Sequence, residues 1–102
     1  MNQALGVIEV IGTVPASVCI DTMGKTAYIT VRKVEQIGSG LVTIMIEGDV
    51  ASVNIALEAG AEQAARYGEV VGTRTIAKPS KNLTSLFANK IENEAADKEA
   101  GE

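Results

Sequence analysis

Apolar and polar positions along the chain recur with two different periods, one typical of strands and one typical of helices. Residues 4–11 form an apolar run interrupted by Glu9, and residues 27–34 alternate between apolar and polar side chains, so each predicts a strand. Residues 41–46 form a nearly continuous β-branched and apolar run, which predicts a buried third strand. Residues 69–76 predict a fourth strand.

Two segments with helical spacing separate these strands. The first covers residues 14–25, with Thr13 as the expected N-cap. The second covers residues 50–67 and has the clearer pattern, with Asp49 as its expected N-cap and Gly68 as its expected C-cap. The apolar positions expected to face the core in the first helix are Val14, Val18, Ile20 and Met23.

The predicted order of elements is therefore βαββαβ, with residues 35–40 as a loop between the second and third strands. An economical arrangement is a four-stranded antiparallel sheet with both helices on one face. This is an α+β sandwich of the ferredoxin-like type. Because that fold supports many unrelated functions, the elements alone do not identify one.

Composition indicates a single domain that shares apolar surface with copies of itself. The chain has 102 residues, of which 46% are hydrophobic and only 3% aromatic, and its mean hydropathy is +0.16. So small a chain, filled mainly by small aliphatic side chains, is expected to cover part of its apolar surface by self-association.

The chain has no histidine and one cysteine, Cys19. The usual imidazole base, the nucleophile pairs that depend on it and most transition-metal sites are therefore excluded, so neither catalytic residues nor a cofactor or metal is expected. A single cysteine cannot form an internal disulfide, which agrees with a cytoplasmic protein. No apolar run is long enough to span a membrane, and no basic stripe indicates nucleic-acid binding.

Most of the net negative charge of the chain lies in its last residues. Residues 89–102 carry two lysines against five acidic side chains, a net charge of −3, whereas the whole chain carries −4. We expect residues 1–88 to form the domain and residues 89–102 to be a disordered acidic tail. Residues 83–88 are expected to form a short helix after Asn82.

Several short segments resemble, in the same order, the single-domain hexameric class of bacterial microcompartment (BMC) shell proteins. That family includes propanediol- and ethanolamine-utilisation shell proteins and carboxysome shell proteins. The resemblance covers about residues 3–88 and rests on ALGVIE at 4–9, DTMGKTA at 21–27, QIGSGLVT at 36–43, GDVA at 48–51, AGA at 59–61, GEVV at 68–71 and IAKP at 76–79.

The resemblance implies a structural shell protein and not an enzyme. Its partners would be five further copies in a cyclic hexamer, then neighbouring hexamers in a sheet, other shell proteins of the same compartment, and small polar metabolites that cross a central pore. The segment that matches the family's pore loop comprises Ile37, Gly38, Ser39 and Gly40. We expect the two glycines to supply any positive φ and the Ser39 side chain to be free to vary.

The same resemblance assigns Lys25, Tyr28 and Lys78 to the edge where hexamers meet. Lys25 matches the family's edge lysine. Lys78 stands where the family commonly has arginine, and Tyr28 replaces a smaller polar residue, so these two positions depart from the family pattern. A different class of function stays open beside the shell, namely an oligomeric ferredoxin-like regulatory domain that senses a small molecule.

Overall fold

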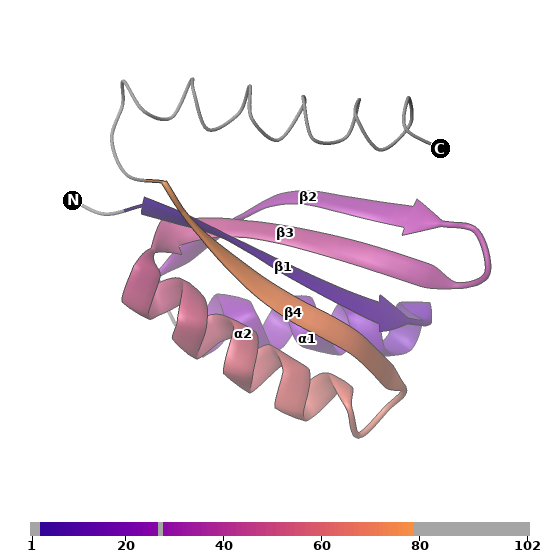
Figure 1. Cartoon of the computed structure of the whole chain (residues 1–102). Coiled ribbons are helices and arrows are strands. Elements are labelled where there is room, and N and C mark those ends of the chain that lie inside the picture. Colours follow the sequence, from indigo (N-terminus) through magenta and orange to yellow (C-terminus); the bar gives the residue numbers. More distant parts are fainter. Residues whose placement is uncertain (1–2, 27, 79–102) are drawn as a thin grey trace, which may run out of the picture.

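Six elements follow one another in the predicted order (Figure 1). The structure is a computed structural model and describes residues 3–26 and 28–78. The elements are β1 (Gln3–Ile11), α1 (Thr13–Thr26), β2 (Ile29–Ile37), β3 (Leu41–Asp49), α2 (Val50–Ala64) and β4 (Glu69–Lys78). The predicted boundary at residue 88 and the tail that follows it lie outside the described residues.

The four strands form one sheet in the order β2-β3-β1-β4, and every neighbouring pair is antiparallel. Both helices lie on one face of this sheet, α1 on the β2 side and α2 on the β4 side (Figure 1). The predicted α+β fold class is therefore confirmed. Strands β2 and β4 are the two edges of the sheet.

The core lies between the helices and one face of the sheet. Alternate residues of β1 and β3 point into it, because successive side chains of a strand point to opposite faces. In β3, Val42, Ile44 and Ile46 are buried, whereas the residues between them are half-buried. The predicted third strand is thus buried on the helix face and half-buried on the other face, because the described residues place helices on one face only.

Several element boundaries differ from the predictions, among them the end of β3, which was predicted at residue 46 and lies at Asp49. Strand β2 continues to Ile37, since residues 35–37 pair with β3, so only three residues remain for the turn. Helix α2 ends at Ala64 with Ala65 as its C-cap, and Gly68 lies beyond it. Helix α1 begins at Thr13, and the N–H of Ala16 donates to the Gly12 carbonyl, so Thr13 belongs to the first turn.

The buried side of α1 agrees with the prediction only in part. Val14 is 59% exposed, contrary to the prediction, whereas Met23 is fully buried as predicted and Cys19 is fully buried too. These two side chains pack on α2 at Gly60, where an added Cβ would lie 2.7 Å from Met23 Cγ and 2.9 Å from Cys19 Sγ. The helices approach so closely because residue 60 has no side chain.

Neither helix among residues 3–26 and 28–78 has the length and apolar character needed to cross a bilayer.

Candidate pore loop and edge surface

The four predicted pore residues lie together at one end of the β2–β3 hairpin. Ile37 pairs with Leu41, and Gly38, Ser39 and Gly40 form the turn between them. Residues 36–42, together with Thr13, line a shallow hollow on the surface. The turn is exposed, so its backbone groups and the Ser39 side chain are available to a neighbouring molecule.

The backbone of this turn differs from the sequence expectation. Gly40 has a φ of +80°, as expected for a glycine, but Ser39 itself has a φ of +71°. Gly38 does not have a positive φ, and an added Cβ there would meet nothing within 4 Å. The left-handed region is unfavourable for most side chains other than glycine, asparagine and aspartate. Positions 39 and 40 are therefore both constrained, and position 38 is free to carry a side chain.

A hydrogen bond ties the turn to the start of α1. The backbone N–H of Gly12 lies 2.7 Å from the carbonyl oxygen of Gly40. Gly12 has a φ of +107°, which a residue with a side chain rarely adopts. The sequence analysis did not single out Gly12 as part of a site. Its contact with Gly40 has no local sequence signal, since 28 positions separate the two residues.

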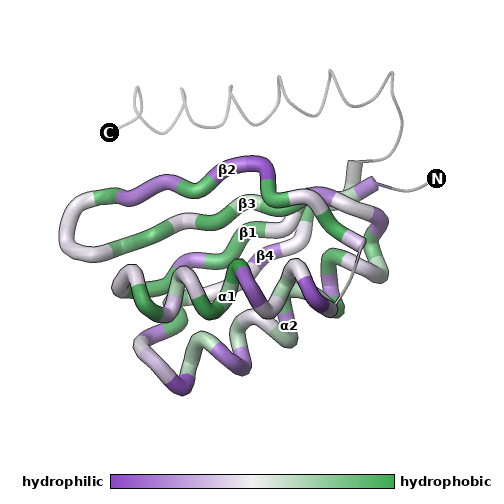
Figure 2. Tube along the Cα trace, turned by 180° about the vertical axis from the view of Figure 1, so that it is seen from behind, coloured by the Kyte–Doolittle hydropathy of each residue, from purple (hydrophilic) through white to green (hydrophobic). Residues whose placement is uncertain are grey.

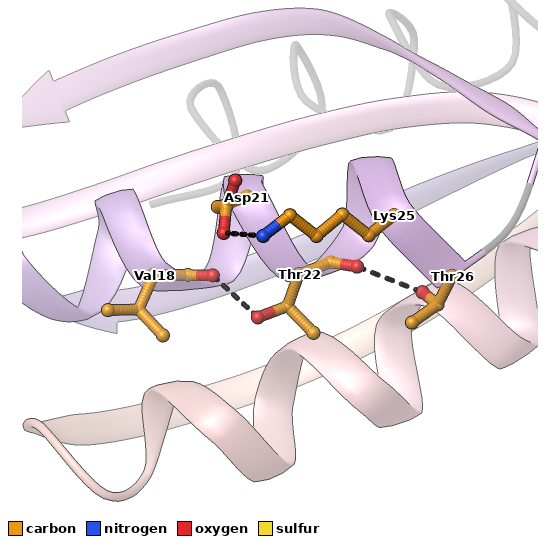
Figure 3. Close-up of polar contacts among 5 residues, drawn as sticks. All are labelled: Val18, Asp21, Thr22, Lys25 and Thr26. Carbon is orange, nitrogen blue, oxygen red and sulfur yellow. Dashed lines mark hydrogen bonds and ion pairs between the residues drawn. The ribbon is translucent and has the colours of Figure 1, made fainter.

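Lys25, the predicted edge lysine, lies in the last turn of α1 and is largely exposed. Its Nζ lies 3.0 Å from Oδ2 of Asp21, one helical turn earlier (Figure 3). On the same helix, the Thr22 and Thr26 hydroxyls donate to the carbonyl oxygens four residues before them (Figure 3). Sequence reasoning missed Asp21 as a partner, although the i, i+4 spacing of opposite charges would have indicated it.

Tyr28 and Lys78 lie at the same end of the sheet, on opposite edges. Tyr28 directly precedes β2 and is 94% exposed. Lys78 is the last residue of β4 and pairs with Gln3, which in turn pairs with Asp49 at the end of β3. The Tyr28 carbonyl lies close to Gly48 of β3, where an added Cβ would be 2.8 Å from it.

The predicted pore and edge residues therefore occupy opposite ends of the fold. Strand β2 starts next to Tyr28 and ends at Ile37, and nine residues of strand span roughly 26 Å at about 3.3 Å per step. Helix α1 runs in the opposite direction, from its contact with the hairpin turn to Lys25. One end of the fold carries the glycine turn, and the other carries Lys25, Tyr28 and Lys78.

Reactive chemistry is sparse among the described residues. Cys19 is buried, and burial raises the pKa of its thiol to about 11, so the thiol stays protonated and unreactive near neutral pH. Glu58 and Glu62 lie exposed on α2. Within residues 3–26 and 28–78, no three His, Cys, Asp or Glu side chains come together as a metal site would require.

Comparison with known proteins identifies the family. The profile of the BMC domain matches residues 4–79. The chain is 42% identical to the bacterial microcompartment shell protein EutM of Salmonella typhimurium over 83% of this chain and 88% of EutM. It is 37% identical to the shell protein PduA of Citrobacter freundii, over 88% of this chain and 97% of PduA.

Carboxysome proteins and a solved structure are also similar. The carboxysome shell protein CcmK2 of Synechocystis is 42% identical over 81% of this chain and 82% of its own length. A crystal structure of a microcompartment protein from Desulfitobacterium hafniense matches with a TM-score of 0.67 at 26% identity, over 72% of this chain and 40% of that one. Fold, ordered motifs and these relatives agree, and the chain belongs to the BMC domain family of bacterial microcompartment shell proteins.

Proposed function

We propose that the chain forms cyclic homohexamers that tile edge to edge in a microcompartment shell, with Ile37, Gly38, Ser39 and Gly40 around a central pore. The observation that supports this most directly is the separation of the two candidate sites. A ring tile needs one end of each subunit at its axis and the other at its rim. The hairpin turn and the Lys25 end of the fold lie apart in this way.

The surface between these ends offers two apolar sides for neighbouring subunits. Along β2, Val31 and Val34 pair with the buried Ile46 and Ile44 of β3, yet they are 36% and 47% exposed because the helices cover β2 less than they cover β1. Figure 2 shows apolar (green) and polar (purple) positions along β2, the edge strand of the sheet. We call Val31 and Val34 the first lateral surface.

At the opposite edge of the sheet, Tyr67 lies just before β4 and is 57% exposed, and Val71 lies within β4 and is 51% exposed. We call these two residues the second lateral surface. Two different apolar surfaces on opposite sides suit a heterologous contact, in which the first surface of one subunit meets the second surface of the next. Such contacts form a closed ring when the repeated rotation from one subunit to the next returns to the first subunit.

The pore would admit small polar metabolites. A turn of glycine backbone and one hydroxyl can replace part of a polar solute's hydration shell but offers little to an apolar solute. Because Gly38 has open space and no positive φ, Gly38→Leu adds an apolar side chain to the lining without straining the turn. We expect it to slow the entry of polar substrate into intact compartments, with Gly38→Ala as the smaller matched change.

Assembly is the test of the proposal. Native mass spectrometry at micromolar concentration should give a mass of about six 10.6-kDa chains, and electron microscopy of concentrated protein should show sheets, tubes or honeycomb arrays. A stable monomer or dimer would contradict the ring. Discrete oligomers that respond to metabolites and never form arrays would instead favour the regulatory domain.

A further inference from the structure

The face of the sheet opposite the helices carries charged side chains at both of its edges. Strands β2 and β4 are these edges, on opposite sides of the subunit (Figure 1). On β2, Glu35 pairs with Thr43, a half-buried residue of β3 on the face away from the helices. Lys33 lies on the same face, and its Nζ lies 3.9 Å from Oε2 of Glu35. Both side chains are largely exposed, so the β2 edge presents an accessible carboxylate beside a lysine.

On β4, Arg74 is the charged residue of that same face. Its neighbour Thr75 points towards the helices, because the Thr75 hydroxyl donates to Oδ1 of Asn54 on α2 at 2.8 Å, so Arg74 points the other way. Arg74 is exposed, and among residues 3–26 and 28–78 it forms no ion pair. Two positions before it, Gly72 leaves open space, since an added Cβ there would meet nothing within 4 Å.

Strand pairing arranges these residues in two rows that cross the whole sheet. The inner row, nearer to the hairpin turn, consists of Glu35, Thr43, Glu9 and Gly72. The outer row consists of Lys33, Met45, Val7 and Arg74. Each row thus begins at the β2 edge and ends at the β4 edge.

A cyclic ring brings the two ends of each row close together. In the proposed ring, every subunit points its hairpin turn at the axis and its β2 edge at the β4 edge of a neighbour. Rotation about the axis keeps each residue at its distance from that axis, so a row of one subunit meets the same row of the next. Glu35 of the next subunit then faces the open space at Gly72, one row inside Arg74. One row is two residues, or roughly 7 Å along a strand, which the Arg and Glu side chains span together.

The charges of the outer row also call for a carboxylate at this contact. Lys33 of one subunit and Arg74 of its neighbour lie in the same row, and like charges that meet at an interface are unfavourable. Glu35 already lies beside Lys33 and is exposed, so it can bind Arg74 from its other side. Arg32, the other base at the β2 edge, donates to Glu47 within its own subunit.

We propose that Arg74 of each subunit binds the Glu35 carboxylate of the next subunit, and that this ion pair makes the ring select copies of this chain. The proposal rests on the ring of the proposed function and names the residues that determine which subunits join it. The apolar lateral surfaces supply the main contact area, whereas a charge pair across a contact mainly discriminates between partners.

Two charge-reversed variants test the pair. Glu35→Arg places two arginines at every contact, and Arg74→Glu places two carboxylates there. Each variant alone should need about tenfold more protein to form hexamers, because a subunit that leaves the ring breaks two contacts. In an equimolar mixture, a ring in which the two variants alternate has opposite charges at every contact. Native mass spectrometry with one variant isotope-labelled should therefore show hexamers restored, with three copies of each variant as the main species.

Two further proteins serve as controls. Glu58→Arg makes the same charge change in the hollow between α1 and α2 and should form hexamers as readily as the parent protein. The double variant Glu35→Arg/Arg74→Glu has opposite charges at every contact and should also assemble like the parent. High salt should reduce the preference for alternating rings, because exposed ion pairs are screened.

The outcomes separate the ion pair from the ring. Single variants that form hexamers as readily as the parent protein and mix at random would overturn the ion pair and leave the ring intact. A mixture that assembles as weakly as its two components would also overturn it. Recovery in the mixture shows that both variants are folded, so their weak assembly alone is then a property of the contact. A parent protein that forms no hexamer would contradict the ring itself, and the ion pair with it.

Discussion

The backbone N–H of Gly12 lies 2.7 Å from the carbonyl oxygen of Gly40, so one hydrogen bond joins the start of α1 to the tip of the β2–β3 hairpin. Both residues have positive φ, +107° and +80°. The candidate pore loop is thus a three-residue turn that is restrained by the pairing of β2 with β3 and also by the hydrogen bond from Gly12. A turn restrained in this way can present the same backbone groups from every subunit of a ring.

Substitutions at the two glycines of the turn should have unequal effects. Gly40→Ala should reduce the free energy of unfolding by about 1 kcal/mol, because a residue with a Cβ is unfavourable at a φ of +80°. Gly38→Ala should change it by less than about 0.5 kcal/mol, since an added Cβ meets nothing within 4 Å. Urea denaturation measures both. Equal losses would show that the turn has a different backbone conformation.

Ser39 should tolerate asparagine better than a β-branched residue. Asparagine adopts the left-handed region readily, whereas valine at a φ of +71° should reduce the free energy of unfolding by about 1–2 kcal/mol. The comparison of Ser39→Asn with Ser39→Val in the same denaturation experiment tests the conformation of residue 39. A valine variant as stable as the asparagine variant would argue against positive φ at this position.

Lys25→Ala should prevent the formation of arrays while leaving hexamers intact. The Lys25–Asp21 ion pair is exposed, and exposed pairs contribute little to stability, so the fold should be unaffected. Electron microscopy and native mass spectrometry give the two readouts. Arg66→Ala removes the same charge from the exposed turn after α2 and should leave arrays unchanged. Sheets like those of the parent protein would mean that Lys25 is not the edge residue.

The N-cap of α2 should make stability depend on pH. The Asp49 carboxylate accepts hydrogen bonds from the Ser52 N–H at 2.9 Å and the Ser52 hydroxyl at 3.0 Å, and these lower the pKa of Asp49 below its ordinary value of 3.8. A pKa lowered by folding stabilises the protein above about pH 4, and that contribution is lost as the pH falls through the folded-state pKa.

Two substitutions separate the charge of this cap from its hydrogen bond. Asp49→Asn keeps an acceptor and should have a higher thermal midpoint at pH 7 than Asp49→Ala, which has none. The difference between the parent protein and Asp49→Ala should shrink from pH 7 to pH 3. A difference that stays constant over this range would show that the cap carboxylate does not contribute.

Two helical glycines should respond to alanine with opposite signs. Gly24→Ala should stabilise the protein by about 0.5–1 kcal/mol, because alanine is the better helix former and nothing lies within 4 Å of an added Cβ. Gly60→Ala should destabilise it by about 1–3 kcal/mol, because the methyl group would meet Met23 and Cys19. Thermal unfolding of both variants tests the two predictions. A stabilised Gly60→Ala would mean that the helices are further apart than in the structure.

For residues 3–26 and 28–78, the number, order and type of elements could be predicted from the sequence because helical and strand periodicity are local properties. Asp49 could likewise be identified as an N-cap, since a cap depends on a few neighbouring residues. The extent of β2 could not, because residues 35–37 are mostly polar and form a strand by pairing with β3. Which residues of α1 are buried depended on α2, whose Gly60 accepts Cys19 and Met23.

The candidate site divides in the same way. Ordered motifs in the sequence were enough to indicate the pore and edge residues by resemblance, and Lys25 and Gly40 were among them. Only the tertiary structure placed the two groups at opposite ends of the fold, gave Ser39 rather than Gly38 the positive φ, and joined Gly12 to Gly40. These features follow from strand register and from contacts between distant segments, which a local pattern of side chains does not encode.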